Sequence, residues 1–155
     1  MKTLAVLPGS YDPVTKGHVE LVRRALAVFG KCEVLVMNNR KKKYRFSLEE
    51  RYEFCRAAFG VMDGVTVSFY DGLLYKWLKD RPGAVLVKGV RNGEDLAYER
   101  RQAAYNYPRC GVETVYLDAG EKWADVSSSK VRELLASGGD WKKLVPREIV
   151  PLLKR

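Results

Sequence analysis

Short runs of apolar residues alternate along the chain with longer segments in which apolar residues recur every three or four positions. Short apolar runs bounded by turn residues are typical of buried strands, and a spacing of three or four residues is typical of amphipathic helices. The runs predict five strands, over residues 4–7, 33–37, 65–69, 84–87 and 112–117.

Helices are expected between and after these strands. The apolar residues from Val19 to Phe29 fall on one helical face, and Gly30 follows as a stop signal. Residues 47–50, Ser-Leu-Glu-Glu, form a capping box that opens a helix running to about residue 59. Further helices are expected over residues 73–78, 94–106 and 127–135, with a short last helix near Pro146.

This order of elements predicts an α/β fold: a Rossmann-like, doubly wound, five-stranded parallel sheet in a single domain spanning residues 1–155. With the usual strand order 3-2-1-4-5, the chain changes direction between strands one and four, and ligands bind beyond the carboxyl ends of the strands at that point. The segments expected at the site are residues 8–18, 88–93 and 118–129.

Composition narrows the class of protein. With 46% hydrophobic and 30% charged residues, the chain has an ordinary globular composition. Cys32, Cys55 and Cys110 are too far apart in sequence for a zinc motif or a disulfide framework, so they are expected to be reduced. No apolar stretch approaches the roughly 18 residues of a membrane span, and the first residues lack a signal-peptide pattern. We therefore expect a cytoplasmic protein that does not span a membrane.

The net charge is +9, and five of the positive charges lie in the seven residues from Asn39 to Arg45, which include no acid. Such a run is usually a solvated surface or a contact with a polyanion. Three classes of partner remain open on this evidence: a polynucleotide, an anionic membrane or small phosphorylated ligands.

The segment after the first strand has the makings of a phosphate site. Gly9 allows close approach of the backbone, Ser10 adds a hydroxyl donor, and Gly17-His18 opens a helix whose free N–H groups favour an anion. The structural alternative is a simple turn in which His18 caps the helix. Because the chain's one histidine falls at a helix start beyond the first strand, we favour the functional interpretation.

Two further segments carry anion-binding residue types. Ser127, Ser128 and Ser129 precede Lys130 at another predicted helix start, although serines cap helices in many proteins. Lys88 and Arg91 follow the fourth strand, at the predicted change of chain direction. Exposed cations often form only a solvated rim, so the position of these two residues carries the argument.

Several of these motifs together resemble a known family. Residues 15–18, Thr-Lys-Gly-His, and residues 127–132, Ser-Ser-Ser-Lys-Val-Arg, resemble two signatures of the nucleotidyltransferase superfamily. Within it the chain resembles the bacterial phosphopantetheine adenylyltransferases over nearly its whole length, including residues 8–13, 46–51, 88–91, 98–99 and 123–129.

The resemblance implies transfer of AMP from ATP to 4′-phosphopantetheine with Mg²⁺, giving dephospho-coenzyme A and pyrophosphate. It implies a homohexamer, and coenzyme A as a possible feedback ligand. On this interpretation we expect neither a nucleic acid nor a membrane as a partner. His18, Ser10, Lys42 and Arg91 would be catalytic, and no protein metal ligand is implied. The acceptor would contact Ser10, Lys42, Leu74 and Lys88. The nucleotide would contact Ser10, Tyr11, His18, Gly89, Val90, Arg91, Glu99, Ala124, Asp125, Val126, Ser127, Ser128, Ser129 and Lys130.

Three positions depart from the commonest pattern of that family: Ser10 stands for threonine, Tyr11 for phenylalanine and Lys88 for arginine. The first two keep the hydroxyl and the ring. Lys88 replaces a bidentate guanidinium with a point charge, so its geometry on a phosphate must differ.

Two alternatives stay open on the residues alone. The motifs describe a site for a nucleoside triphosphate, and they also fit a nucleotidyltransferase with a pyridine mononucleotide or glycerol phosphate as acceptor. A basic polynucleotide-binding domain would account for the net charge, although no RNP, KH, zinc-finger or helix-turn-helix pattern occurs.

Overall fold

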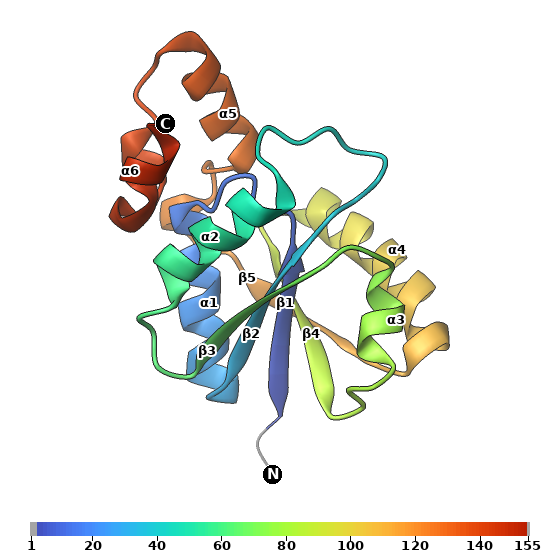
Figure 1. Cartoon of the computed structure of the whole chain (residues 1–155). Helices are drawn as coiled ribbons and strands as arrows, with labels where there is room; N and C mark the ends of the chain where they lie inside the picture. The colour runs from blue at the N-terminus through green and yellow to red at the C-terminus, as the bar shows by residue number, and fades with distance from the viewer. Residues whose placement is uncertain (1–2, 155) are drawn as a thin grey trace.

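A computed structural model describes residues 3–154, and its centre is a five-stranded sheet in which every pairing is parallel. The strand order is β3-β2-β1-β4-β5, as the sequence predicts. Helices cover both faces, and the C-terminal helices lie beyond one end of the sheet (Figure 1). The strands are β1 (Leu4–Gly9), β2 (Cys32–Met37), β3 (Val65–Tyr70), β4 (Ala84–Val90) and β5 (Thr114–Asp118).

Alternation of side chains along the strands divides the core into two layers. In β1, Ala5 and Leu7 pack into the larger layer, whereas Val6 between them packs into the smaller one. β2 behaves in the same way, with Leu35 in the smaller layer. Because both faces of the sheet are covered, the central strands read as continuous apolar runs, and this is why they were recognisable from sequence.

The helices fall close to the intervals that the sequence predicts. They are α1 (Lys16–Phe29), α2 (Leu48–Phe59), α3 (Leu74–Leu78), α4 (Gly93–Cys110), α5 (Ser128–Ser137) and α6 (Val150–Leu153). A short 3-10 helix, Arg147–Ile149, leads into α6. No helix within residues 3–154 is long and apolar enough to cross a membrane.

Several boundaries differ from the prediction by a few residues, including the end of β1, which runs to Gly9. The helix expected to stop near residue 106 runs through Pro108 to Cys110 and ends at Gly111, whose φ is 72°. The last strand begins at Thr114, after the buried Val112. β4 continues to Val90, because residues 88–90 pair with residues 116–118 of β5. Lys88 and Gly89 are weak strand formers, so the local pattern hides this extension.

The sheet order places the change of chain direction between β1 and β4, which pair side by side from Leu4 and Ala84 onward. Two loops and one helix start therefore meet above the carboxyl end of β1: the β1–α1 loop, the long loop between β2 and α2, and the start of α5 (Figure 1). This arrangement confirms the expected fold class and directs attention to that end of the sheet.

The capping box of α2 offers a test of the local structure. Ser47 Oγ accepts the Glu50 N–H at 3.1 Å, and Glu50 Oε1 accepts the Ser47 N–H at 3.1 Å. Ser47→Ala should lower the free energy of unfolding by about 1 kcal/mol, measured by urea titration. Ser137→Ala, at the last residue of α5, is the matched control. An equal loss in both variants would contradict a specific role for the box.

Candidate active site

His18 occupies the third position of α1, and the helix cap fixes its ring. The Thr15 N–H donates to His18 Nδ1 at 3.0 Å, and the His18 N–H donates to Thr15 Oγ1 at 3.4 Å. A ring nitrogen that accepts an N–H carries no proton, so the proton of the neutral imidazole lies on Nε2. His18 is thereby prepared to donate one hydrogen bond through Nε2.

The electrostatic surroundings keep this ring neutral. Burial lowers the pKa of His18 to about 4, and the positive charge of Lys88 contributes in the same direction. At neutral pH the imidazole is therefore an uncharged donor and not a cation.

Tyr11 packs with its side chain against the ring of His18. Its backbone adopts a φ of 50°, its side chain is 5% exposed, and its hydroxyl donates to the Leu7 carbonyl at 2.7 Å. The ring centroids of Tyr11 and His18 lie 4.8 Å apart. A Cβ on Gly9 would come within 3.1 Å of the Tyr11 ring, so glycine is needed there. The Tyr11 side chain is thus committed to the core, and a contact with a nucleotide would fall to its backbone.

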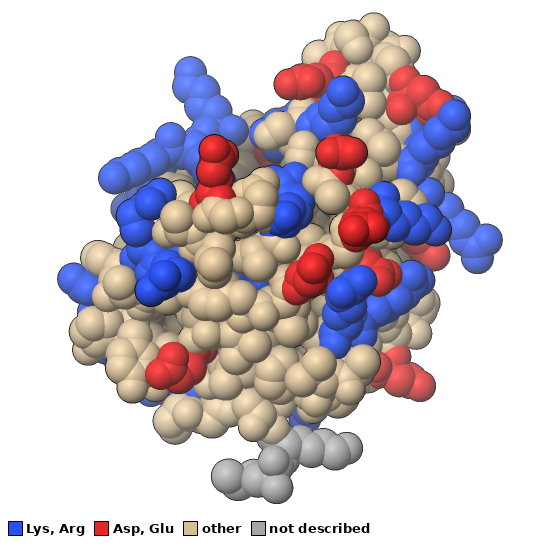
Figure 2. Space-filling view, turned by 180° about the vertical axis from the view of Figure 1, so that it is seen from behind, with Lys and Arg blue, Asp and Glu red and all other residues tan. Residues whose placement is uncertain are grey.

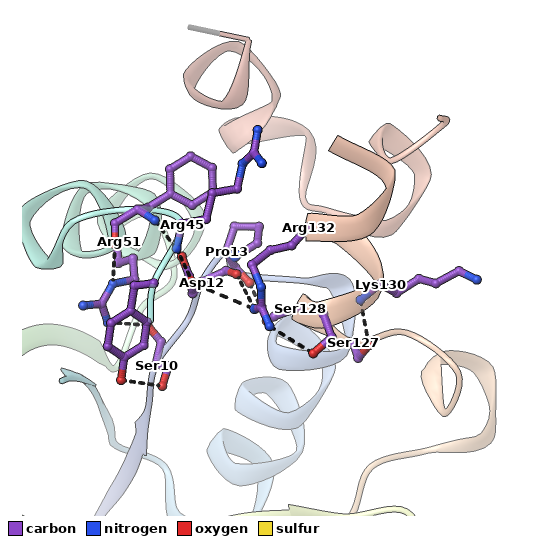
Figure 3. Close-up of polar contacts among 12 residues, drawn as sticks. Ser10, Asp12, Pro13, Arg45, Arg51, Ser127, Ser128, Lys130 and Arg132 are labelled. Carbon is purple, nitrogen blue, oxygen red and sulfur yellow. Dashed lines mark hydrogen bonds and ion pairs between the residues drawn. The ribbon is translucent and has the colours of Figure 1, made fainter. Parts of the chain in front are cut away.

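Asp12, 2% exposed, joins three segments that are distant in sequence. Its carboxylate accepts the N–H groups of Arg45 and Phe46, both at 3.0 Å (Figure 3). Arg132 of α5 lies 3.8 Å from Asp12 Oδ2 and donates to the Asp12 carbonyl at 2.8 Å. One buried carboxylate therefore holds together the β1–α1 loop, α5 and the loop between β2 and α2. This last loop, residues 38–47, contains the run of cations and is called the basic loop.

The starts of α1 and α5 converge as a result. Ser128 Oγ donates to the Pro13 carbonyl at 2.8 Å, and Ser127 caps α5 by accepting the Lys130 N–H at 3.1 Å (Figure 3). A helix leaves its first N–H groups without intrahelical acceptors, and this cap takes one of them. The two helix starts, held side by side, have the polarity that an anion requires.

Arg91 connects β4 to the segment before α5. Its guanidinium donates to the Ala124 carbonyl at 3.2 Å and to Asp95 at 3.0 Å, and the bond to Asp95 lowers the pKa of that carboxyl. Gly89 lies against α1, where a Cβ would come within 3.0 Å of the Leu21 side chain. The segments 89–91 and 124–130, both predicted to contact the nucleotide, are thus adjacent.

A cavity of about 1020 Å³ opens beside these helix starts, between β1, β4 and α4. Its lining includes Ser10, Lys42, Leu74, Lys88 and Glu99 among the residues predicted for the site. Lys88 Nζ lies 3.2 Å from Glu99 Oε2. Glu99 Oε2 is buried and accepts no well-directed hydrogen bond from any described residue, so the ion pair compensates its burial and holds Lys88 within the cavity.

The predicted residues therefore form two adjoining groups. Those predicted for the acceptor all line the cavity, together with Glu99, which was predicted for the nucleotide. The other residues predicted for the nucleotide lie outside the cavity lining, in the β1–α1 loop, at the end of β4 and at the starts of α1 and α5, with His18 and Arg91 among them.

Sequence reasoning missed the residues that hold this arrangement together. Thr15 was identifiable, because it stands three positions before His18 as in a capping box. The roles of Asp12, Tyr44 and Arg51 have no local signal, because each of them has a partner at least 33 positions away. Arg132 bonds across 120 positions to Asp12.

Comparison with known proteins identifies the class. Residues 6–134 match the model of the cytidylyltransferase-like family. A solved structure from Vibrio parahaemolyticus, proposed to be a nicotinate-nucleotide adenylyltransferase, has the same fold with a TM-score of 0.71 and 17% identity, and the alignment covers 100% of both chains.

Curated relatives narrow the assignment. A phosphopantetheine adenylyltransferase of a Nocardioides species is 43% identical over 93% of this chain and 91% of its own. That of Thermotoga neapolitana is 41% identical over 97% of this chain and 94% of its own. The chain therefore belongs to the cytidylyltransferase-like family of nucleotidyltransferases and, within it, to the phosphopantetheine adenylyltransferases.

The environment of His18 gives a prediction that needs no substrate. Because the chain has one histidine, its ring Hε1 resonance is unique in a sample from which any affinity tag has been removed. Followed by NMR from about pH 8 to about pH 3, this resonance should titrate with a midpoint of about 4, below the ordinary value of 6.5. A midpoint at the ordinary value would show that the ring is solvated and free of Lys88.

Proposed function

We propose that the chain transfers AMP from ATP to 4′-phosphopantetheine, releasing pyrophosphate and forming dephospho-coenzyme A. The observation that carries the proposal is similarity to phosphopantetheine adenylyltransferases along nearly the whole chain. The geometry supports it independently, because a polar surface at two helix starts adjoins a cavity large enough for an extended phosphorylated acceptor.

The residues suit a displacement at phosphorus. The acceptor phosphate is already an anion, so the reaction needs neither a side-chain nucleophile nor a strong base. In-line attack on the α-phosphorus needs positioning and compensation of negative charge. In the proposed mechanism the acceptor phosphate lies in the cavity near Ser10, Lys42 and Lys88, and the triphosphate lies along the starts of α1 and α5.

His18 would act on the transferring phosphate. Its Nε2–H points one donor at the charge that develops there, and the neutral ring gives up no proton when it binds. Arg91 would place the nucleotide side of the site through its bonds to Asp95 and the Ala124 carbonyl. In this proposal Lys88 contacts the acceptor as a single point charge, and its ion pair with Glu99 sets the direction from which it approaches.

We propose Mg²⁺ as the cofactor, bound together with ATP. Within residues 3–154 no group of three or more His, Cys, Asp and Glu side chains is placed to hold a metal ion. Mg²⁺ suits a site with few protein ligands, because it usually keeps several waters and binds through substrate phosphates. When bound, the ion would neutralise charge on the phosphates, and the carboxylates that line the cavity are those of Asp71 and Glu99.

We further propose, from the family resemblance, a homohexamer in the cytoplasm with coenzyme A as a feedback ligand. Half-exposed apolar residues, including Phe69 and Leu73, offer surface for subunit contacts. The thiols of Cys32 and Cys55 are free and buried, and burial raises the pKa of both. Free thiols are consistent with the reducing environment of the cytoplasm.

The distribution of charge gives less support to the alternative that the chain binds a polynucleotide than to a site for a small phosphorylated ligand. On the face seen from behind in Figure 2, Lys and Arg side chains are interspersed with Asp and Glu and form no continuous basic stripe. The run of cations from Arg40 to Lys42 instead lines the cavity. That position favours a compact phosphorylated ligand over a long phosphate backbone.

The substrate assignment is tested by pyrophosphate release. With ATP and Mg²⁺, kcat/KM for 4′-phosphopantetheine should exceed that for nicotinamide mononucleotide or glycerol phosphate by about a hundredfold or more. Equal or greater turnover with either alternative acceptor would overturn the assignment. Tight, salt-sensitive binding of DNA or RNA without ATP binding would favour the polynucleotide-binding class instead.

The role of His18 is tested by His18→Ala. Loss of one preorganised donor should lower kcat about a hundred- to a thousandfold, measured at saturating concentrations of both substrates. Circular dichroism and the thermal midpoint control for folding, and the neighbouring surface variant Glu20→Gln should leave kcat unchanged. Turnover near the wild-type rate would remove His18 from the mechanism.

A further inference from the structure

The basic loop between β2 and α2 contains a tyrosine that contacts residues of the cavity lining without being part of that lining. Tyr44 follows the run of cations but does not line the cavity, whereas residues 38–42 do. Its ring is partly buried against the guanidinium of Arg51, whose carbon lies 4.0 Å from the ring centroid. Its hydroxyl faces two residues that do line the cavity, Ser10 and Asn39.

The hydroxyl links Ser10 to the turn that carries Lys42. The Asn39 N–H donates to the Tyr44 oxygen at 2.6 Å, and the Lys42 N–H donates back to the Asn39 carbonyl at 2.9 Å. The Lys41 N–H donates to Asn39 Oδ1 at 3.0 Å, which closes the same turn. Tyr44 therefore holds the first residue of a turn whose last residue is Lys42.

The same hydroxyl lies 3.4 Å from Ser10 Oγ. Because the Tyr44 oxygen already accepts the Asn39 N–H, its own proton is free to point at Ser10. Either hydroxyl can donate this bond, and when Tyr44 donates, Ser10 Oγ accepts and keeps its own proton for an anion in the cavity. One phenol thus orients a hydroxyl donor and places an ammonium group on the same side of the cavity.

Arg51 explains why the ring stays in place. Its side chain is 1% exposed and donates to the carbonyls of Ser10 and Met37, both at 2.9 Å, and to that of Phe46 at 3.1 Å. It also donates to Asn38 Oδ1. The guanidinium is therefore fixed to the ends of β1 and β2, and it gives Tyr44 a rigid surface to stack on.

We propose that Tyr44 is a positioning residue for the acceptor phosphate: its hydroxyl couples Ser10 to the Asn39–Lys42 turn, and Arg51 holds its ring in place. The inference rests on the proposed function for the identity of the acceptor, and on the geometry alone for the coupling. Tyr44 does not contact the substrate and acts through Lys42 and Ser10.

Tyr44→Phe tests the proposal, because it keeps the ring on Arg51 and removes only the hydroxyl. KM for 4′-phosphopantetheine should rise about three- to tenfold, the effect of losing a hydrogen bond of ordinary strength. KM for ATP and kcat should each change by less than about twofold. Tyr107→Phe is the matched control, since Tyr107 is exposed on α4 and outside the cavity lining, and it should match wild type.

A double-mutant cycle distinguishes positioning from a general structural role. In a Lys42→Ala background the effect of Tyr44→Phe on KM for the acceptor should become smaller, because only the route through Ser10 remains. Equal effects in both backgrounds would overturn the inference, as would an equal rise in KM for ATP and for the acceptor.

Amide hydrogen exchange measures the coupling without any substrate. By NMR, the Asn39 amide should exchange faster in Tyr44→Phe than in wild type or Tyr107→Phe. Unchanged exchange would overturn the inference even if the kinetics agreed. If the wild-type protein fails to use 4′-phosphopantetheine, the proposed function fails, and the exchange of Asn39 still decides whether Tyr44 holds the turn.

Discussion

The site depends on one buried carboxylate. An ionised carboxyl group inside a protein is tolerated only when hydrogen bonds and charges replace its water. Asp12 meets this requirement with two backbone N–H groups of the basic loop and with Arg132 of α5. The requirement brings together three segments that the sheet alone would leave independent. This junction fixes where the cavity lies relative to the starts of α1 and α5.

The start of α1 shows a similar double use of one residue. In an ordinary capping box a glutamate or glutamine side chain accepts the N–H of the cap residue. Here His18 takes that position, and its Nδ1 accepts the Thr15 N–H. The bond that stabilises the helix also fixes the tautomer, so Nε2 carries the proton on the side left free. A protonated ring could not accept the bond, and the lowered pKa and the cap therefore reinforce each other.

The sequence predicted the elements well where a strand is buried on both faces, or where neighbouring residues cap a helix. The core strands and the start of α2 belong to this group. It failed at the end of β4, where pairing with β5 overrides the weak propensity of Lys88 and Gly89. In the site it identified the residues that could meet phosphate, because helix starts and cations are visible locally. It missed Asp12, Tyr44 and Arg51 as organising residues, because their roles exist only in contacts made across the fold.

The basic loop raises a physical difficulty that these organising residues resolve. Five like charges within seven residues repel one another and favour an extended, mobile loop. Its backbone is instead bonded at Asn39 by Tyr44, and at Arg45 and Phe46 by Asp12 and Arg51. Arg51 also bonds the side chain of Asn38. These bonds fix the main chain and leave the side chains of Arg40, Lys41 and Lys42 at the cavity. The cost of ordering the loop is thus incurred during folding, so less of it remains to oppose the binding of a phosphorylated ligand.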